Sequence, residues 1–233
     1  MLWICGAGLA LVIGTLVLGG YFAGSAGSFT AAPNRPRPAL AAVFWSGDMG
    51  LLVGFGSDLP ERLANRGIPV LAISSPALFG EARDGAFARA AVARSLQQAI
   101  RRSGARKVAL VGFSFGADVL AASVGELAPG LRARIASIVL VGPGSGVHFH
   151  ANPFGIFYTG TPDADSAHMA DALRGLPVSC IFAASEDESL CREPRLAGAR
   201  VLSVPGGHLM LAHRQEVTED VIEAVLNPAR PLR

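Results

Sequence analysis

Apolar positions along the chain gather in six short runs, and four of the runs are followed by a stretch with apolar residues at helical spacing. Runs of seven to nine mainly apolar residues are typical of strands buried on both faces. The pattern predicts strands over residues 39–46, 68–74, 107–113, 135–143, 177–184 and 199–206. It predicts helices over residues 57–67, 84–102, 116–127 and 212–226, the first of them with Ser57 as its N-cap.

Strands that alternate with helices predict an α/β fold with a mostly parallel sheet of about six strands, flanked by helices on both faces. One segment breaks the alternation. Residues 143–168 are long, aromatic and rich in Gly and Pro. A connection of this length is usually a functional loop or lid, so we expect it to lie near a binding site.

The amino-terminal segment differs from the rest of the chain. No charged side chain occurs between residues 2 and 30, and residues 2–22 are long enough to cross a bilayer. The segment is either a retained membrane anchor or a secretory signal cleaved within "AGSAGSFTAAP", and the sequence leaves both open. Either way it predicts an exported, periplasmic protein, with residues 2–22 as the candidate anchor to the inner membrane.

We therefore divide the chain into three parts. Residues 1–30 are the signal peptide or anchor, residues 31–39 with their "NRPRP" motif form a stiff linker, and residues 40–233 form the α/β domain.

Composition narrows the classes of function that this chain can have. The chain has 233 residues, of which 51% are hydrophobic and 16% charged, with a net charge of +2. It is long enough for one domain with a full core, and it contains no basic block of the kind that binds nucleic acid. His148 and His150 in "HFH" could share a metal ion, but no third ligand accompanies them, so packing or lid roles are favoured. The sequence predicts neither a metal nor a cofactor.

The strongest chemical motif follows the third predicted strand. Gly112-Phe113-Ser114-Phe115-Gly116 fits G-x-S-x-G with a strand before it and a helix after it, which is the context that the motif requires. A serine on such a tight turn is exposed as a nucleophile, and glycines on both sides let the turn close. The motif predicts an α/β-hydrolase fold and a serine hydrolase acting on carboxylic esters.

The nucleophile needs a base and an acid, which in this fold follow in the order Ser, acid, His. His208 in "SVPGGHLM" directly follows the sixth strand, and two glycines before it allow the loop to reach the serine. After the fifth strand, "AASEDES" offers three carboxylates. Counting from Ala183 at the strand end favours Glu186 as the acid, with Asp187 as the alternative and Glu188 third.

Two further features bear on substrate binding. The N–H of Phe115 and one N–H from "WSGDMG", either that of Asp48 or that of Met49, are expected to form the oxyanion hole. Asp48 and Asp118 would also lie at the mouth of the site. We expect these two carboxylates to bind a cationic group of the substrate, although helix-capping roles would explain them as well.

The chain has three cysteines, and Cys5 lies in the amino-terminal segment. The other two, Cys180 and Cys191, lie eleven residues apart on either side of the acidic run. In an exported protein such a pair is expected to form a disulfide, which would staple the turn that holds the acid. The alternative is two unrelated buried thiols.

Taken together, "SGDMG", "GFSFGADVL", "C…EDESLC" and "PGGHL" resemble the bacterial VirJ/AcvB family of exported α/β-hydrolases over about residues 40–215. The resemblance implies catalytic roles for Ser114 and His208, and it aligns Asp118 with the aspartate of the family's serine motif. The glycine that usually ends the fifth strand in this family is Ala183 here.

The resemblance implies hydrolysis of aminoacyl-phosphatidylglycerol, whose amino acid is lysine or alanine, at the periplasmic face of a membrane. The ammonium beside the scissile carbonyl would explain the two carboxylates, and the partner would be a phospholipid-like ester in the membrane. Two alternatives remain. One is a generic exported carboxylesterase or thioesterase, and the other is a non-catalytic accessory that binds type IV secretion proteins. The sequence does not specify the amino acid or the oligomeric state.

Overall fold

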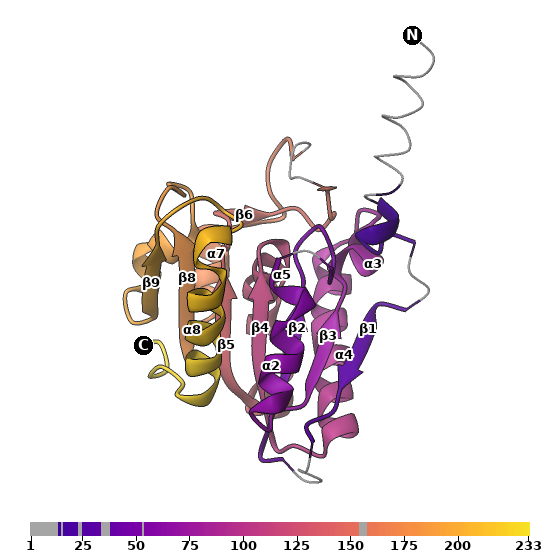
Figure 1. Cartoon of the computed structure of the whole chain (residues 1–233). Helices are drawn as coiled ribbons and strands as arrows, with labels where there is room; N and C mark the ends of the chain where they lie inside the picture. The colour runs from indigo at the N-terminus through magenta and orange to yellow at the C-terminus, as the bar shows by residue number, and fades with distance from the viewer. Residues whose placement is uncertain (1–13, 15, 23–24, 34–37, 53, 154–157) are drawn as a thin grey trace.

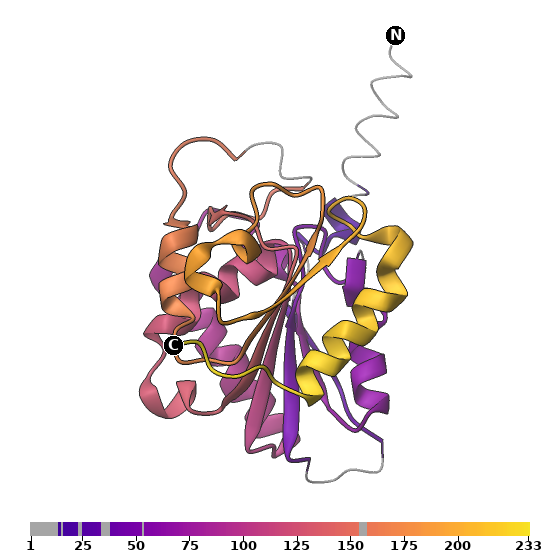
Figure 2. The same cartoon turned by 90° about the vertical axis from the view of Figure 1, so that its left-hand side faces the viewer.

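The computed structural model describes residues 14, 16–22, 25–33, 38–52, 54–153 and 158–233. Its centre is a seven-stranded sheet in the order β1-β3-β2-β4-β5-β8-β9, and β6 and β7 form a separate two-stranded ribbon. Neighbouring strands of the large sheet are parallel, except that β1 pairs antiparallel with β3. The sheet twists through the middle of the molecule with helices on both sides (Figures 1 and 2).

The strands of the large sheet coincide with the apolar runs of the sequence. β2, β3, β4, β5 and β8 are buried along nearly their whole length, as expected for parallel strands covered on both faces. The strand bounds are β1 Gly27–Thr30, β2 Leu40–Trp45, β3 Val70–Ile73, β4 Lys107–Phe113, β5 Ile135–Val141, β6 Gly146–Val147, β7 Ala164–Asp165, β8 Val178–Ala183 and β9 Arg200–Val204. The predicted fold class is confirmed, with all six expected parallel strands present.

Strand β1 was not expected. It lies within residues 1–30 and adds a seventh strand to the predicted six by pairing antiparallel with β3 at the sheet edge. Its four residues follow an uncharged stretch without a break in pattern, so the sequence alone does not mark them as a strand. Most of the candidate anchor lies outside the described residues, and no helix within the described part is both long and apolar enough to span a bilayer.

Helices cover both faces of the sheet. α4, α5 and α7 pack with one face in one apolar cluster, and α2 and α8 pack with the opposite face in a second cluster. The bounds of the α-helices are α2 Leu59–Asn65, α3 Ser75–Phe79, α4 Gly85–Ser103, α5 Phe115–Ser123, α6 Pro129–Arg132, α7 Ser166–Ala172 and α8 Arg214–Leu226. The 3₁₀ turns are η1 Gly54–Ser57, η2 Val124–Glu126, η4 Leu190–Arg192, η5 Pro194–Leu196 and η6 Leu211–His213.

The cap predicted for the first helix is wrong by one residue. α2 begins after Asp58 as its N-cap, while Ser57 ends the preceding turn η1. The Asp58 carboxylate pairs with Arg62, 3.2 Å away, and with Arg214, 2.6 Å away. The pair with Arg62 is local, at i and i+4 of the helix start, whereas Arg214 lies 156 positions away and no local pattern reveals that contact.

Alternation within the strands assigns side chains to the two clusters. In β2, Val43 and Trp45 belong to the cluster with α4 and α5, whereas Ala42 and Phe44 belong to the cluster with α2 and α8. Since the strands are parallel, their carboxyl ends meet at one edge of the sheet, and the loops that follow β2, β4, β8 and β9 come together there. In open α/β sheets this edge is where ligands bind.

Candidate active site

Ser114 lies in the turn between β4 and α5 with φ of +52° and ψ of −126°. An L-residue pays roughly 1–3 kcal/mol for such a backbone conformation, and the surrounding structure has to hold it there. The flanking glycines make the turn possible. A Cβ on Gly112 would lie 2.5 Å from Cα of Ala117, and one on Gly116 would lie 2.4 Å from the main-chain oxygen of Ser46. The spacing of the motif is therefore a steric requirement of the turn.

His208 reaches this serine from the loop after β9. Its Nε2 lies 2.8 Å from Oγ of Ser114, within hydrogen-bond distance. The ring also stacks on Phe113, with centroids 5.9 Å apart and planes inclined by 27°. The nucleophile candidate and the base candidate are thus in contact, although 94 residues separate them in the sequence.

Glu186 completes the line of hydrogen bonds. Its Oε1 accepts a hydrogen bond from Nδ1 of His208, and its Oε2 accepts one from the N–H of Ala183 at 2.9 Å. Partial burial alone would raise the pKa of Glu186, but the bonds from His208 and Ala183 outweigh it and lower the pKa below its ordinary value. Asp187 and Glu188 are exposed on the outside of the same turn.

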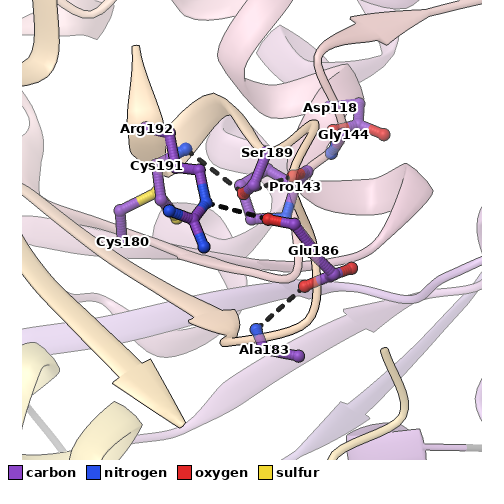
Figure 3. Close-up of a disulfide and its surroundings, with 9 residues drawn as sticks. All are labelled: Asp118, Pro143, Gly144, Cys180, Ala183, Glu186, Ser189, Cys191 and Arg192. Atoms are coloured by element: carbon purple, nitrogen blue, oxygen red, sulfur yellow. Dashed lines mark hydrogen bonds between the residues drawn. A yellow bond between two sulfur atoms is a disulfide. The ribbon is translucent and has the colours of Figure 1, made fainter. Parts of the chain in front are cut away.

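The turn that carries Glu186 is held by a disulfide and by several hydrogen bonds (Figure 3). Cys180 and Cys191 are bonded, with their Cα atoms 5.5 Å apart, so the predicted disulfide is confirmed. Arg192 donates from Nε to the main-chain oxygen of Glu186 at 2.9 Å and from Nη2 to that of Ala184 at 3.2 Å. Arg192 was not expected to hold this turn, because an arginine beside an acidic run has many possible partners.

The same turn is joined to the loop after β5. Ser189 donates from Oγ to the main-chain oxygen of Pro143 at 2.9 Å, and the N–H of Leu190 donates to that of Gly144 at 3.1 Å. Gly144 in turn donates its N–H to Oδ1 of Asp118 at 2.8 Å. Residues 184–192, which we call the acid turn, therefore position a second carboxylate indirectly. Figure 3 shows Glu186 in this turn and Asp118 beside Gly144.

Asp118 is buried in the first turns of α5 and lines the cavity in front of Ser114. Burial raises its pKa well above the ordinary value, the hydrogen bond from Gly144 opposes this, and the negative charges of Asp48 and Glu186 raise the pKa further. A cation placed in the cavity would relieve this cost.

Asp48 is held differently. Its Oδ1 accepts hydrogen bonds from the N–H of Asn152 at 3.0 Å and from the hydroxyl of Tyr158 at 2.9 Å. The hydroxyl of Tyr21 donates to the main-chain oxygen of Asp48 at 3.1 Å. Burial raises the pKa of Asp48, and the bonds from Asn152 and Tyr158 partly offset the rise. Both tyrosines of the chain thus bind Asp48. The sequence carries no signal of this role beyond the fact that the chain has only two tyrosines.

The oxyanion-hole candidates lie at the same place. α5 begins at Phe115, directly after Ser114, so the N–H of Phe115 lies at the positive end of this helix, next to the serine. Asp48 and Met49 line the cavity from the loop after β2. Gly47 brings this loop close, since a Cβ there would lie 3.2 Å from Cβ of Ser114.

A cavity of about 500 Å³ opens in front of the serine, a size suited to a small-molecule ligand. Residues of the expected lid line part of it, between Gly144 and His148 and at Tyr158, whereas residues 154–157 of this segment 143–168 lie outside the described chain. The ring of His148 stacks on Tyr158 with centroids 5.5 Å apart. Within the described residues, no three His, Cys, Asp or Glu side chains are placed to hold a metal ion. The lining comes from the loops after β2, β4, β5 and β9 and includes Gly47, Asp48, Met49, Phe113, Ser114, Phe115, Asp118, Gly142, Gly144, His148, Tyr158, His208 and Leu209.

Solved structures with a similar fold cover most of this chain. Est1E from Butyrivibrio proteoclasticus superposes with a TM-score of 0.64 at 13% identity, covering 86% of this chain and 92% of its own. An esterase domain from a Rhodothermus marinus protein has a TM-score of 0.57 at 15% identity, covering 88% and 99%. An alpha-beta serine hydrolase homologue from Coxiella burnetii has a TM-score of 0.58 at 12% identity, covering 85% and 90%. These likenesses show that the chain has the α/β-hydrolase fold.

Sequence comparison supplies the family. No curated protein matches the chain significantly. The family model described as "Bacterial virulence protein (VirJ)" matches residues 39–228, which span nearly the whole folded domain. The chain therefore belongs to the VirJ family of bacterial virulence proteins.

Proposed function

We propose that this protein is a serine hydrolase that cleaves carboxylic esters through a triad of Ser114, His208 and Glu186. The observation that carries the proposal is the distance of 2.8 Å between Oγ of Ser114 and Nε2 of His208, at a serine with a strained backbone. The opposite ring nitrogen bonds Glu186, which orients the imidazole and leaves Nε2 free to accept the hydroxyl proton. Structural relatives that include a named esterase domain support the same class of reaction.

The reaction follows from these positions. Oγ of Ser114 attacks the ester carbonyl while His208 takes its proton, and the ionised Glu186 stabilises the imidazolium. His208 then gives the proton to the leaving alkoxide, which departs as an alcohol and leaves an acyl-serine. Water attacks the acyl-serine by the reverse proton transfers, releasing the carboxylic acid and the free serine.

Charge on the carbonyl oxygen is met by main-chain N–H groups. The N–H of Phe115 at the start of α5 and an N–H of Asp48 or Met49 would point to the oxyanion, supported by the positive end of the helix dipole. One such donor is typically worth about a hundredfold or more in rate.

The substrate that we propose carries an ammonium group next to the scissile carbonyl, as in lysyl- or alanyl-phosphatidylglycerol. Support comes from Asp118, a buried carboxylate that lines the cavity close to the nucleophile. A buried carboxylate is costly unless it is paired, and a substrate ammonium would pair with it. Asp48 adds negative charge nearby, but its Oδ1 is already bonded to Asn152 and Tyr158, so its share in binding the ammonium is the smaller one.

A periplasmic location is part of the proposal. The Cys180–Cys191 disulfide is consistent with an oxidising compartment, and the uncharged residues 2–22 are consistent with export. A membrane lipid as substrate would suit an enzyme that is held at the membrane surface.

Three measurements test the proposal. A fluorophosphonate probe should label the wild-type protein at Ser114 and leave Ser114→Ala unlabelled, because only an activated serine reacts. Hydrolysis of lysyl-phosphatidylglycerol in vesicles should fall at least about 10³-fold in Ser114→Ala. A neutral ester of the same alcohol should be a poorer substrate than the lysyl ester.

Other outcomes separate the alternatives. Equal rates on neutral and lysyl esters would favour a generic carboxylesterase or thioesterase. A protein that fails to label and cleaves neither ester would be a non-catalytic accessory, binding secretion-system proteins instead of a lipid.

A further inference from the structure

Exposed apolar side chains concentrate around the mouth of the cavity. In the part of the chain that the structure describes, eight large apolar side chains are exposed, and six of them lie on segments beside the cavity. We call these six the apolar rim: Val17, Leu18, Phe22, Leu52, Leu209 and Leu211. Their exposed fractions range from 41% for Leu209 to 71% for Phe22.

The apolar rim comes from three segments: residues 16–22, the loop after β2 and the loop after β9. These segments adjoin the site and contact one another through its loops. A Cβ on Gly50 would lie 2.1 Å from the main-chain oxygen of Gly19, so residues 16–22 pack directly on the loop after β2. Tyr21 in this segment donates to Asp48 of the same loop. Gly50 and Leu209 line one cavity, which places the loop after β9 beside them. The rim therefore flanks the entrance to Ser114 from the loops after β2 and β9.

The other two exposed apolar residues lie elsewhere. Val201 is in β9, and Leu226 is the last residue of α8, at the opposite end of this helix from the active-site loops (Figure 1). Monomeric proteins scatter such residues singly, whereas a concentration of them around a binding site marks a surface that contacts an apolar partner.

The position of the amino-terminal sequence identifies the partner. Residues 2–22 carry no charged side chain, and the described chain begins at the same end of the sheet as the active-site loops (Figures 1 and 2). An apolar stretch of this length is long enough to cross a bilayer if it is retained as an anchor. An anchored domain would then have its apolar rim facing the same bilayer.

We propose that this end of the domain docks on a lipid bilayer, with the apolar rim inserted among the headgroups and the cavity opening directly onto the membrane. An ester-bearing headgroup could then reach Ser114 without leaving the bilayer. The choice of a lipid ester rests on the proposed function, whereas the docking surface rests on the apolar rim and can be tested without catalysis.

The first experiment measures docking. In a Cys5→Ser background, an environment-sensitive fluorophore is attached to Leu52→Cys, Leu211→Cys or Leu226→Cys of the full chain in vesicles of phosphatidylethanolamine and phosphatidylglycerol. Emission should shift to the blue at 52 and 211 and remain that of an aqueous site at 226. Three results would overturn the proposal. They are no shift at 52 and 211, an equal shift at all three positions, and a shift that appears when the protein concentration is raised without lipid. The last result would indicate a second copy of the chain.

The second experiment measures access to the substrate. Leu52→Ser/Leu211→Ser should lower hydrolysis of lysyl-phosphatidylglycerol in vesicles about tenfold, because the variant no longer buries the methylenes of two leucines in the bilayer. Hydrolysis of a water-soluble lysine ester should stay within about twofold of the wild-type rate. Leu226→Ser is the matched control and should change neither rate. Loss of both rates in the double variant would contradict docking. Absence of both activities in the wild type would instead overturn the proposed function, and the fluorescence shifts would still decide docking.

Discussion

The two loops that bring the proposed acid, Glu186, and the proposed base, His208, to Ser114 are built in opposite ways. The acid turn, residues 184–192, is closed by a disulfide and bonded through Arg192 and Ser189. The base loop, residues 205–210, is exposed up to His208 and Leu209, and Ser185 of the acid turn donates to its Gly206 oxygen at 2.8 Å. The base loop is therefore held by the acid turn, through Ser185 and Glu186, and by the stacking of His208 on Phe113. The covalent closure lies in the turn that orients the imidazole.

The largest effects should come from the two side chains themselves. His208→Ala removes the base and should lower kcat by about 10⁵–10⁶-fold, whereas Glu186→Gln should lower it by about 10³–10⁴-fold, as in other serine hydrolases with this arrangement. Steady-state kinetics on a soluble ester measures both. Asp187→Asn is the matched control for Glu186→Gln and should retain activity within about twofold. A larger loss in Asp187→Asn than in Glu186→Gln would move the acid role to the neighbouring residue.

Opening the disulfide tests the firmness of the acid turn. Cys180→Ser/Cys191→Ser should lower the free energy of unfolding by about 2–4 kcal/mol, because the unfolded chain is no longer constrained. It should also lower kcat about tenfold, because Glu186 loses its fixed place. Denaturant titration and kinetics measure the two effects, with Cys5→Ser as the control. Wild-type kcat in the double variant would show that hydrogen bonds alone hold the turn.

Asp118, which the acid turn reaches through Gly144, allows a test by pH. A raised pKa in the folded state means that this carboxyl stabilises the fold below the unfolded pKa, about 4, and loses that contribution as pH rises through the folded pKa. Asp118→Asn should therefore raise Tm by roughly 2–4 °C at neutral pH, and the difference should vanish below about pH 4.

The variant that gains stability should lose substrate preference. In Asp118→Asn the preference for lysyl over neutral esters should fall at least about tenfold, while kcat on the neutral ester stays within a few-fold of the wild type. In the wild type that preference should grow as pH rises and Asp118 ionises. A preference that does not change with pH or with this substitution would remove Asp118 from substrate binding.

The smallest effects are expected at the two glycines of the base loop, Gly206 and Gly207. Gly207 has open space around a potential Cβ and an ordinary φ, so Gly207→Ala should change kcat by less than about twofold. Gly206 has φ of +102°, and Gly206→Ala should cost about 1–3 kcal/mol in strain and lower kcat several-fold. Thermal unfolding and kinetics of the pair compare them directly. Equal, large losses in both variants would mean that the base loop is as firmly fixed as the acid turn.

Some features of the molecule could be predicted because they depend on neighbours in the chain. Six parallel strands and the helices α2, α4, α5 and α8 follow from the apolar pattern, whereas α3, α6 and α7 were not predicted. The turn at Ser114 follows from two glycines at a spacing that sterics requires. His208 could be singled out because it directly follows a predicted strand, and parallel strands bring their carboxyl ends to one edge. These are local or topological regularities, so one sequence suffices to see them.

Tertiary structure alone decided the rest. Three consecutive carboxylates follow β8, and only the path of the turn places Glu186 against His208 and leaves the next two in solvent. The bonds of Asp48 to Tyr21 and Tyr158 join residues 27 and 110 positions apart, and the edge strand β1 exists only because β3 offers it a partner. The sequence by itself determined the six parallel strands, four of the helices and the places where Ser114 and His208 emerge. The acid, the state of the two buried aspartates and the surroundings of the cavity depend on contacts between distant segments, whose energies no local pattern records.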